Sequence, residues 1–295
     1  MFDFLQHLLN GLQLGSIYAL VALGYTMVYG IVKLINFAHG EIIMVGAYAS
    51  LQVIPLLLQA GLPIWLCVFV SAIFCALLGV VLEEIAYRPL RNAPRLCSLI
   101  TAIGMSLLLQ NLAQMIFTSN PKPFPNVFPT KPFHIGAIQT SINTILTIGV
   151  SIVLMVLLHL YTKTTKSGRA MRCVSEDLGA ARLMGINVNR TIMITFAIGS
   201  ALAAVASVFY ANTYPVVEPV MGSMMGLKAF IAAVLGGIGI IPGAMFGGIL
   251  MGITEGMAKA YIDSRTADAI VFGILILVLL FKPSGLFGKN VKEKV

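Results

Sequence analysis

The amino-acid sequence predicts an all-α protein, a polytopic bundle of membrane-spanning helices. The chain of 295 residues is 58% hydrophobic and only 10% charged, whereas a water-soluble domain carries about 25% charged residues. Its mean hydropathy is +0.94. A single core in a chain of this length cannot hide so much apolar surface from water, so a protein that crosses a bilayer several times is predicted.

The apolar runs define the expected helices, because each crossing needs about 20 apolar residues. We expect about eight to ten spans, some of them short or interrupted by glycine. The runs cover residues 8–32, 37–59, 62–86, 97–117, 143–161, 191–213, 226–241, 243–262 and 267–282. The segments between them fall short of the usual domain size of about 50 residues. Residues 1–295 are therefore expected to form a single transmembrane domain.

The basic residues predict how the chain is oriented. Segment 162–190 carries six Lys or Arg residues and the tail from 282 carries four Lys, whereas loop 118–142 has only Lys122 and Lys131. Positively charged loops remain in the cytoplasm. We therefore expect the N-terminus outside, loop 118–142 outside and the C-terminus inside. The net charge of +8 is explained by this pattern, so nucleic-acid binding is not expected.

The first apolar run is expected to remain in the mature protein. No Lys or Arg precedes Lys33, whereas a secretory signal peptide begins with a positively charged stretch.

Three polar residues stand at the start of the second run, in the stretch INFAHGE. Asn36 is expected to cap the helix, and Glu41 to lie in its first turn, where the helix dipole favours a carboxylate. His39 and Glu41 are two residues apart and should point to different faces. A capped helix start and a gate at the cytoplasmic end of a pathway both explain them; the cost of charge in a membrane favours the gate.

Loop 118–142 contains five prolines and cannot be helical through its middle. An ordered extracytoplasmic cap, a docking surface and a simple connector all remain open.

The cytoplasmic segment 162–190 is expected to contain a short helix of two to three turns. Ser175 could cap it, Glu176 and Asp177 would favour its N-terminal end, and Gly185 could end it in the left-handed conformation. It has too few apolar residues to span a bilayer. Either it docks a soluble partner or it only links two spans.

The stretch 226–252 contains eight glycines, several of them four residues apart, and Pro242 interrupts it. Small residues at this spacing let helix backbones approach closely. A broken helix within a membrane is tolerated where it is buried in protein or lines a cavity. Tight packing and a pathway lining both remain open.

The charged residues Lys228, Glu255 and Lys259 lie within apolar runs. Glu255 and Lys259 have the favourable i,i+4 order, as do Glu84 and Arg88, so structural ion pairs are expected. The spans lack a relay of acidic residues and histidines, which argues against a proton-coupled carrier.

Sequence patterns of enzymes and cofactor sites are missing. The chain has no GxxxxGK[ST] phosphate-binding loop and no HExxH motif, and its four cysteines lack metal-ligand spacing. We therefore expect neither an enzyme nor a cofactor or metal site.

Four passages together resemble the permeases of high-affinity branched-chain amino acid ABC transporters. They are INFAHGE (35–41), EEIAYRPLRNAP (83–94), SEDLGAARLMGINV (175–188) and GLKAFIAAVLGGIGIIPGAMFGG (226–248). The third also resembles the cytoplasmic loop of ABC importer permeases, in which Ala180, Ala181 and Gly185 fit the pattern and Gly179 replaces its acidic residue.

The resemblance implies the fold of an ABC importer permease in the bacterial plasma membrane and a pathway for leucine, isoleucine and valine. It implies a second homologous permease subunit that forms a heterodimer with this chain, two cytoplasmic ATPase subunits and an extracytoplasmic binding protein. The ATPase-coupling helix would contain Ser175, Glu176, Asp177, Ala180, Ala181, Arg182 and Gly185. The candidates for the pathway or its gate are Asn36, His39, Glu41, Lys228, Gly236, Gly237 and Gly239.

Other solutes and mechanisms remain open. Related systems carry urea, short amides, other amino acids or simple sugars, and an ion-coupled secondary carrier is the alternative outside this family.

Overall fold

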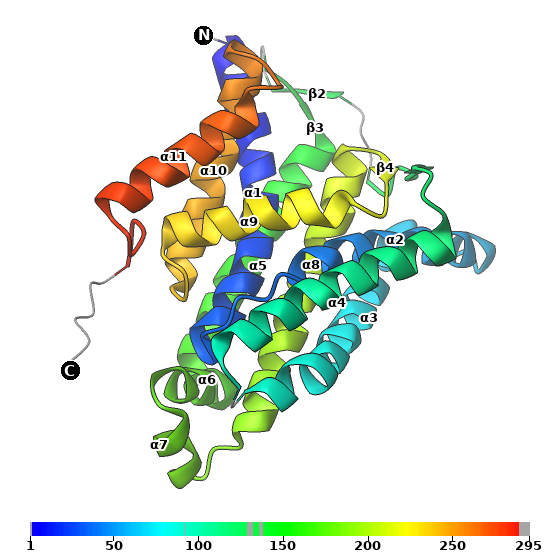
Figure 1. The fold of residues 1–295 in the computed structure, drawn as a ribbon. Helices are drawn as coiled ribbons and strands as arrows, with labels where there is room; N and C mark the ends of the chain where they lie inside the picture. The colour runs from blue at the N-terminus through cyan, green and yellow to red at the C-terminus, as the bar shows by residue number, and fades with distance from the viewer. Residues whose placement is uncertain (1, 92, 129–131, 136–137, 289–295) are drawn as a thin grey trace.

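The computed structural model describes residues 2–91, 93–128, 132–135 and 138–288, and it is a bundle of helices (Figure 1). The α-helices are α1 (Phe2–Val32), α2 (His39–Gln59), α3 (Cys67–Leu82), α4 (Arg95–Phe117), α5 (Ile142–Thr164), α6 (Lys166–Glu176), α7 (Leu178–Leu183), α8 (Val188–Thr213), α9 (Met221–Gly236), α10 (Ile241–Tyr261) and α11 (Ala267–Phe281). Short 3-10 and π turns at Ile64–Leu66 and Glu83–Leu90 extend α3 at both ends.

Each of the nine apolar runs corresponds to a helix. Within the described residues, seven helices are long and apolar enough to cross a membrane, and α9 and α11 are shorter apolar helices. The multi-span helical fold predicted from composition is therefore confirmed. The basic tail residues Lys289, Lys292 and Lys294, and Lys131 of the proline-rich loop, lie outside the described residues.

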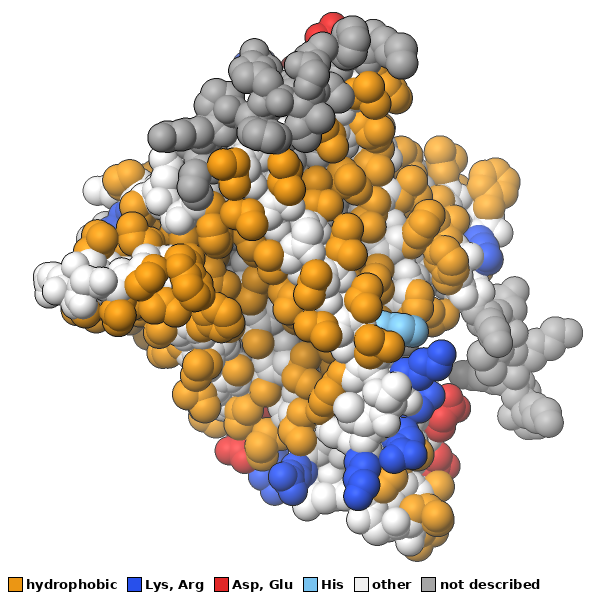
Figure 2. Space-filling view, turned by 180° about the vertical axis from the view of Figure 1, so that it is seen from behind, with side chains coloured by type: hydrophobic (Ala, Val, Ile, Leu, Met, Phe, Trp, Pro, Cys, Tyr) orange, Lys and Arg blue, Asp and Glu red, His pale blue; other side chains and the backbone are white. Residues whose placement is uncertain are grey.

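Helix α1 runs through the middle of the bundle, and α5, α8, α9 and α10 pack around it (Figure 1). In the apolar stretch of α1, 83% of the residues are buried inside the protein. The buried share is 22% in the corresponding stretch of the helix that contains α3 and 17% in that of α4. The outer helices α3, α4, α5 and α11 therefore present the large exposed apolar side chains. A broad hydrophobic surface is visible in Figure 2, and Lys and Arg side chains gather below it.

The packing of α1 on α10 depends on glycines that bring the two backbones together. A Cβ atom added at Gly252 would lie 2.0 Å from the backbone nitrogen of Gly15, and one added at Gly248 would lie 2.4 Å from the Cα of Ala19. These distances are far shorter than any real contact of a Cβ atom, so a side chain does not fit at Gly252 or Gly248 unless the helices move apart. Small residues are therefore required here for helix association in lipid.

The predicted break near Pro242 lies between α9 and α10. Gly237 and Gly239 have φ of 109° and 92°, values that glycine adopts without strain. The segment after α11 fills the break: the backbone N–H groups of Leu286 and Phe287 donate to the carbonyls of Leu235 and Gly236 at 2.9 and 3.1 Å. The glycines thus serve close packing, because Gly236 lies directly against Gly243.

The proline-rich loop is ordered where the structure describes it. Strand β1 (Lys122–Pro123) pairs antiparallel with β4 (Val216–Val217), and β2 (Pro132–Ile135) pairs with β3 (Ile138–Ser141). The backbone N–H groups of Val127 and Phe128 both donate to the Asn212 Oδ1 atom, at 2.8 and 3.2 Å. Residues 127 and 128 of this loop are therefore held at the end of α8.

We predict that Gly252→Ala lowers the stability of the protein, because the new methyl group must push α10 away from α1. Overpacking of this kind costs about 1–3 kcal/mol, and the thermal unfolding of the protein in mild detergent measures it. The matched control is Gly104→Ala on α4, where an added Cβ meets nothing within 4 Å. Equal unfolding temperatures for the two variants would contradict the backbone contact.

Candidate functional site

The carboxylate of Glu41 is the centre of a polar cluster between α2, α4 and α9. Its Oε1 atom accepts hydrogen bonds from Ser106 Oγ at 3.0 Å, Gln110 Nε2 at 2.9 Å and Ser223 Oγ at 3.1 Å. Glu41 is only 1% exposed, and its Oε2 atom has no partner among the described residues. A buried carboxylate held by neutral donors is costly in a membrane and is a strong candidate for function.

Close contact between α2 and α9 brings this cluster together. A Cβ added at Gly40 would lie 2.7 Å from the carbonyl oxygen of Gly222, and one added at Gly226 would lie 2.5 Å from the Cα of Gly40. The two helices therefore cross at their glycines. Since Ser223 follows Gly222 on α9 and Glu41 follows Gly40 on α2, the crossing places the serine hydroxyl beside the carboxylate.

A cavity of about 320 Å³ adjoins Glu41. The polar groups of the cluster line one part of it, and apolar side chains such as Leu107, Leu227 and Phe230 line another. The cavity thus offers a carboxylate oxygen and hydroxyl groups beside an apolar surface.

Asn36 and His39 do not join Glu41, although they are close in sequence. The hydroxyl of Tyr87 donates to Asn36 Oδ1 at 2.6 Å, and α2 is preceded by Ala38, without a side-chain cap. The predicted Asn36 cap is therefore wrong, because the amide is used in a tertiary hydrogen bond. The His39 ring packs on Tyr25 at 4.7 Å between centroids, and His39 is not among the described residues that line the cavity beside Glu41.

A second buried cluster joins α1, α9, α10 and α11 through Glu255. Its Oε1 atom lies 2.9 Å from Lys228 Nζ and 2.7 Å from Lys259 Nζ, and Tyr18 donates to its Oε2 atom at 2.9 Å. Lys228 Nζ also lies 2.6 Å from Asp268 Oδ1. The predicted Glu255–Lys259 pair is confirmed, and two lysines and two carboxylates balance one another.

The second cluster also borders a cavity, of about 430 Å³. Tyr210, Tyr214 and several methionines of α9 line it together with Lys228 and Glu255. Ser223 lines this cavity as well as the one beside Glu41. Helix α9 therefore contributes residues to both cavities, and the Ser223 hydroxyl group borders both of them.

The candidate glycines have different environments. Gly236 and Gly237 pack against Gly243 and the segment that follows α11. Gly239 lines a third cavity, where α1, α5 and α6 meet. Gly236 and Gly237 therefore serve close packing. Of the three candidate glycines, only Gly239 lines one of the described cavities.

Segment 162–190 forms two helices, α6 and α7, where a single short helix is expected. Ser175 lies inside α6 and donates to the carbonyl of Arg172 at 2.7 Å, so its predicted capping role is wrong. The cap of α7 is Asp177, whose Oδ1 atom accepts from the backbone N–H groups of Gly179 and Ala180 at 2.6 and 2.9 Å. Glu176 ends α6 and does not lie at the N-terminus of α7.

The end of α7 projects from the bundle (Figure 1). Gly185 has φ of 77°, as predicted for a residue that ends a helix in the left-handed conformation. Ala181 is buried against the bundle, whereas Arg182 and Ala180 are exposed. Leu183 and Met184 are 89% and 81% exposed, and apolar side chains at such a tip indicate a contact surface.

Sequence analysis did not identify several residues of the Glu41 and Glu255 clusters as candidates for a functional site. Ser106 and Gln110 share one face of α4 at i,i+4 spacing, so two polar residues in an otherwise apolar run were the available signal. Ser223, Tyr18 and Asp268 have no local signal, because their partners lie far away in the chain.

Comparisons with known proteins agree on one family. The family model described as "Branched-chain amino acid transport system / permease component" matches residues 7–280. The chain is 46% identical over 301 residues to the high-affinity branched-chain amino acid transport system permease protein LivH of Escherichia coli (strain K12), covering 99% of this chain and 98% of the relative. It is 45% identical over 303 residues to the corresponding permease protein BraD of Pseudomonas aeruginosa, covering 100% and 99%.

Among solved structures, PsaBC from Streptococcus pneumoniae in complex with Fab resembles this chain with a TM-score of 0.49 and 14% identity. The alignment covers 97% of this chain and 95% of that one.

Proposed function

Because this chain belongs to the family of branched-chain amino acid transport system permease components, we propose that it is the permease subunit of a binding-protein-dependent ABC importer for leucine, isoleucine and valine. The observation that carries this proposal is 46% identity to LivH along 99% of the chain. The helical bundle with its exposed apolar surface is the membrane pathway, and it lies in the bacterial plasma membrane.

The tasks of energy supply and solute capture belong to other subunits in this proposal. Two cytoplasmic ATPase subunits bind at α6 and α7, and Leu183 and Met184 insert into one of them. A homologous permease subunit completes a heterodimer, and an extracytoplasmic binding protein docks on loop 118–142. The exposed tip of α7 and the ordering of the loop by Asn212 support these assignments.

The proposed orientation places the N-terminus outside and the C-terminus in the cytoplasm. It is supported by the basic residues of α6 and by Figure 1, in which the N-terminus lies at the end of the bundle opposite α6 and α7.

The cavity beside Glu41 has chemistry that suits a branched-chain amino acid. At neutral pH the solute carries an ammonium group, a carboxylate and an apolar side chain. The free Oε2 atom of Glu41 can accept the ammonium group, and Leu227 and Phe230 offer apolar contact. We assign Glu41 and Ser223 to the pathway, because both line this cavity and Ser223 also lines the cavity beside Glu255.

The function is tested by reconstituting the complete importer in vesicles with ATP inside and the binding protein outside. We expect uptake of radiolabelled leucine, isoleucine and valine that stops without ATP. Uptake of urea, an amide or a sugar in place of the three amino acids would assign another substrate. Uptake by this chain alone, driven by an ion gradient, would establish a secondary carrier instead.

We predict that Glu41→Gln lowers leucine uptake by the importer while its abundance in the membrane stays near the wild-type value. The amide keeps the shape of the side chain but loses the charge that attracts an ammonium group. A charge-assisted contact of this kind accounts for roughly ten- to hundredfold in rate or affinity. The control is Glu84→Gln, which removes a charge from an exposed pair with Arg88 at 3.6 Å. Unchanged uptake in Glu41→Gln would limit Glu41 to a structural role.

We predict that Met184→Ser weakens the association of the ATPase subunits, because it removes an apolar contact at the centre of their docking surface. Loss of such a contact weakens binding by roughly 30-fold, as measured by co-purification. The matched control is Met115→Ser on α4, because both methionines are 81% exposed. Equal recovery of ATPases with both variants would show that the tip of α7 is not the docking surface.

A further inference from the structure

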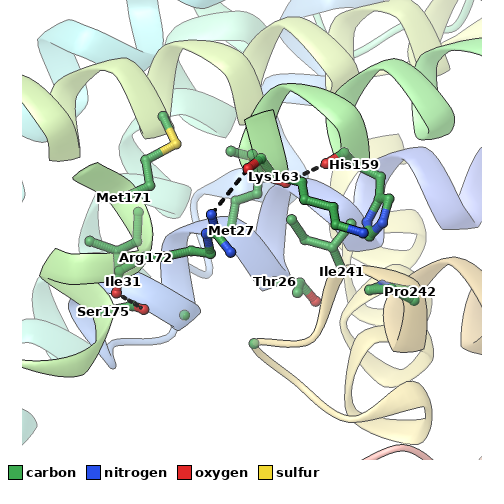
Figure 3. Close-up of a pocket in the computed structure, with 13 residues that line it drawn as sticks. Thr26, Met27, Ile31, His159, Lys163, Met171, Arg172, Ser175, Ile241 and Pro242 are labelled. Carbon is green, nitrogen blue, oxygen red and sulfur yellow. Dashed lines mark hydrogen bonds between the residues drawn. The ribbon is translucent and has the colours of Figure 1, made fainter. Parts of the chain in front are cut away.

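A cavity of about 370 Å³ opens where α1, α5, α6 and the start of α10 meet (Figure 3). It lies apart from the two cavities beside α9 and shares no described lining residue with them. Its walls are apolar, with Met27, Ile31, Met171 and Ile241 among the lining residues. Such walls favour a ligand that brings apolar surface of its own.

The charged side chains that line this cavity are basic. His159 and Lys163 come from α5 and Arg172 comes from α6, and none of the described lining residues is acidic. Arg172 Nη2 donates to the carbonyl of Lys163 at 3.1 Å, which holds the guanidinium group at the cavity (Figure 3). Positive charge without a neighbouring carboxylate attracts an anion.

A buried hydroxyl group gives an independent indication of a ligand. Thr26 lines the cavity and is 1% exposed, yet its Oγ1 atom has no hydrogen-bond partner among the described residues. A threonine within a helix usually donates to the carbonyl three or four residues before it. The hydroxyl of Thr26 is therefore free to donate to a ligand oxygen.

The location of the cavity indicates where the ligand comes from. The exposed side chains of Leu157 and Leu160 on α5 belong to the apolar surface, and Lys163 follows them at the end of the same helix. Lys and Arg side chains gather below that surface in Figure 2. This boundary is the depth at which the phosphate groups of a bilayer leaflet lie, and basic pockets between helices at this depth bind lipid head groups.

We propose that this cavity binds the phosphate-bearing head group of an anionic phospholipid from the cytoplasmic leaflet. Lys163 and Arg172 contact the phosphate, Thr26 donates to a head-group oxygen, and the apolar walls cover the adjoining part of the lipid. Free phosphate has the same charge but leaves the apolar walls unused. The site depends on the membrane boundary and is independent of which solute the protein carries.

Native mass spectrometry of the full-length chain, purified with its partner subunits in mild detergent, tests the site after addition of phosphatidylglycerol. The Lys163→Gln/Arg172→Gln variant should retain this lipid roughly 30-fold more weakly, which is about fivefold for each basic residue removed. Thr26→Val keeps the shape of the side chain and should also weaken retention.

The matched control is Lys33→Gln/Arg190→Gln, which removes two exposed charges that lie outside α6 and α7 and do not line the cavity. This control should retain phosphatidylglycerol as the wild type does. If a glutamine variant aggregates, Lys163→Met/Arg172→Met removes the same charges and keeps the apolar stems.

Three outcomes would overturn the proposal. Equal loss in both double variants would show attraction to diffuse surface charge. Equal retention of phosphatidylcholine would show that the anionic head group is not recognised, and displacement of the lipid by inorganic phosphate would make the cavity a site for small anions.

Discussion

The contact between the backbones of α1 and α10 is the constraint on which the rest of this structure depends. Lipid chains are as apolar as the helix surfaces, so burial of apolar side chains does not hold membrane helices together as it does in water. Close packing takes that role here, and it requires that Gly15 and Gly252 have no side chains. With α10 held at this distance, Glu255 reaches Tyr18 on α1 and Lys228 on α9. The central packing thus determines where the buried charges meet.

Close backbone packing through glycines also holds α2 against α9, but here it brings together a carboxylate and neutral hydrogen-bond donors. Gly40 and Gly222 allow the contact, and the adjoining residues Glu41 and Ser223 are thereby brought within 3.1 Å. The Glu255 cluster is balanced by lysines, whereas Glu41 has only neutral donors and keeps one oxygen free among the described residues. A balanced cluster suits structure, and an unbalanced one suits a passing cation such as an ammonium group.

The end of the bundle that carries α6 and α7 combines two kinds of surface. The tip of α7 is apolar and projects into solvent, as suits contact with another protein. The nearby cavity beside α6 has mainly apolar walls, and its charged side chains are basic, as suits an amphiphile at the membrane boundary. Helix α6 lies between the two, so the proposed protein contact and the proposed lipid contact would occupy neighbouring parts of one short segment.

The sequence by itself determined the nine apolar helices, the break near Pro242, the left-handed residue Gly185 and the Glu255–Lys259 pair. Each depends on residues within a few positions of one another: apolar length, glycine and proline conformation, and i,i+4 spacing. Only the tertiary structure decided which polar groups meet. It joined Asn36 to Tyr87 and brought Ser106 and Ser223 to Glu41. These choices depend on close helix crossings between distant parts of the chain, and no local pattern records which helices will cross.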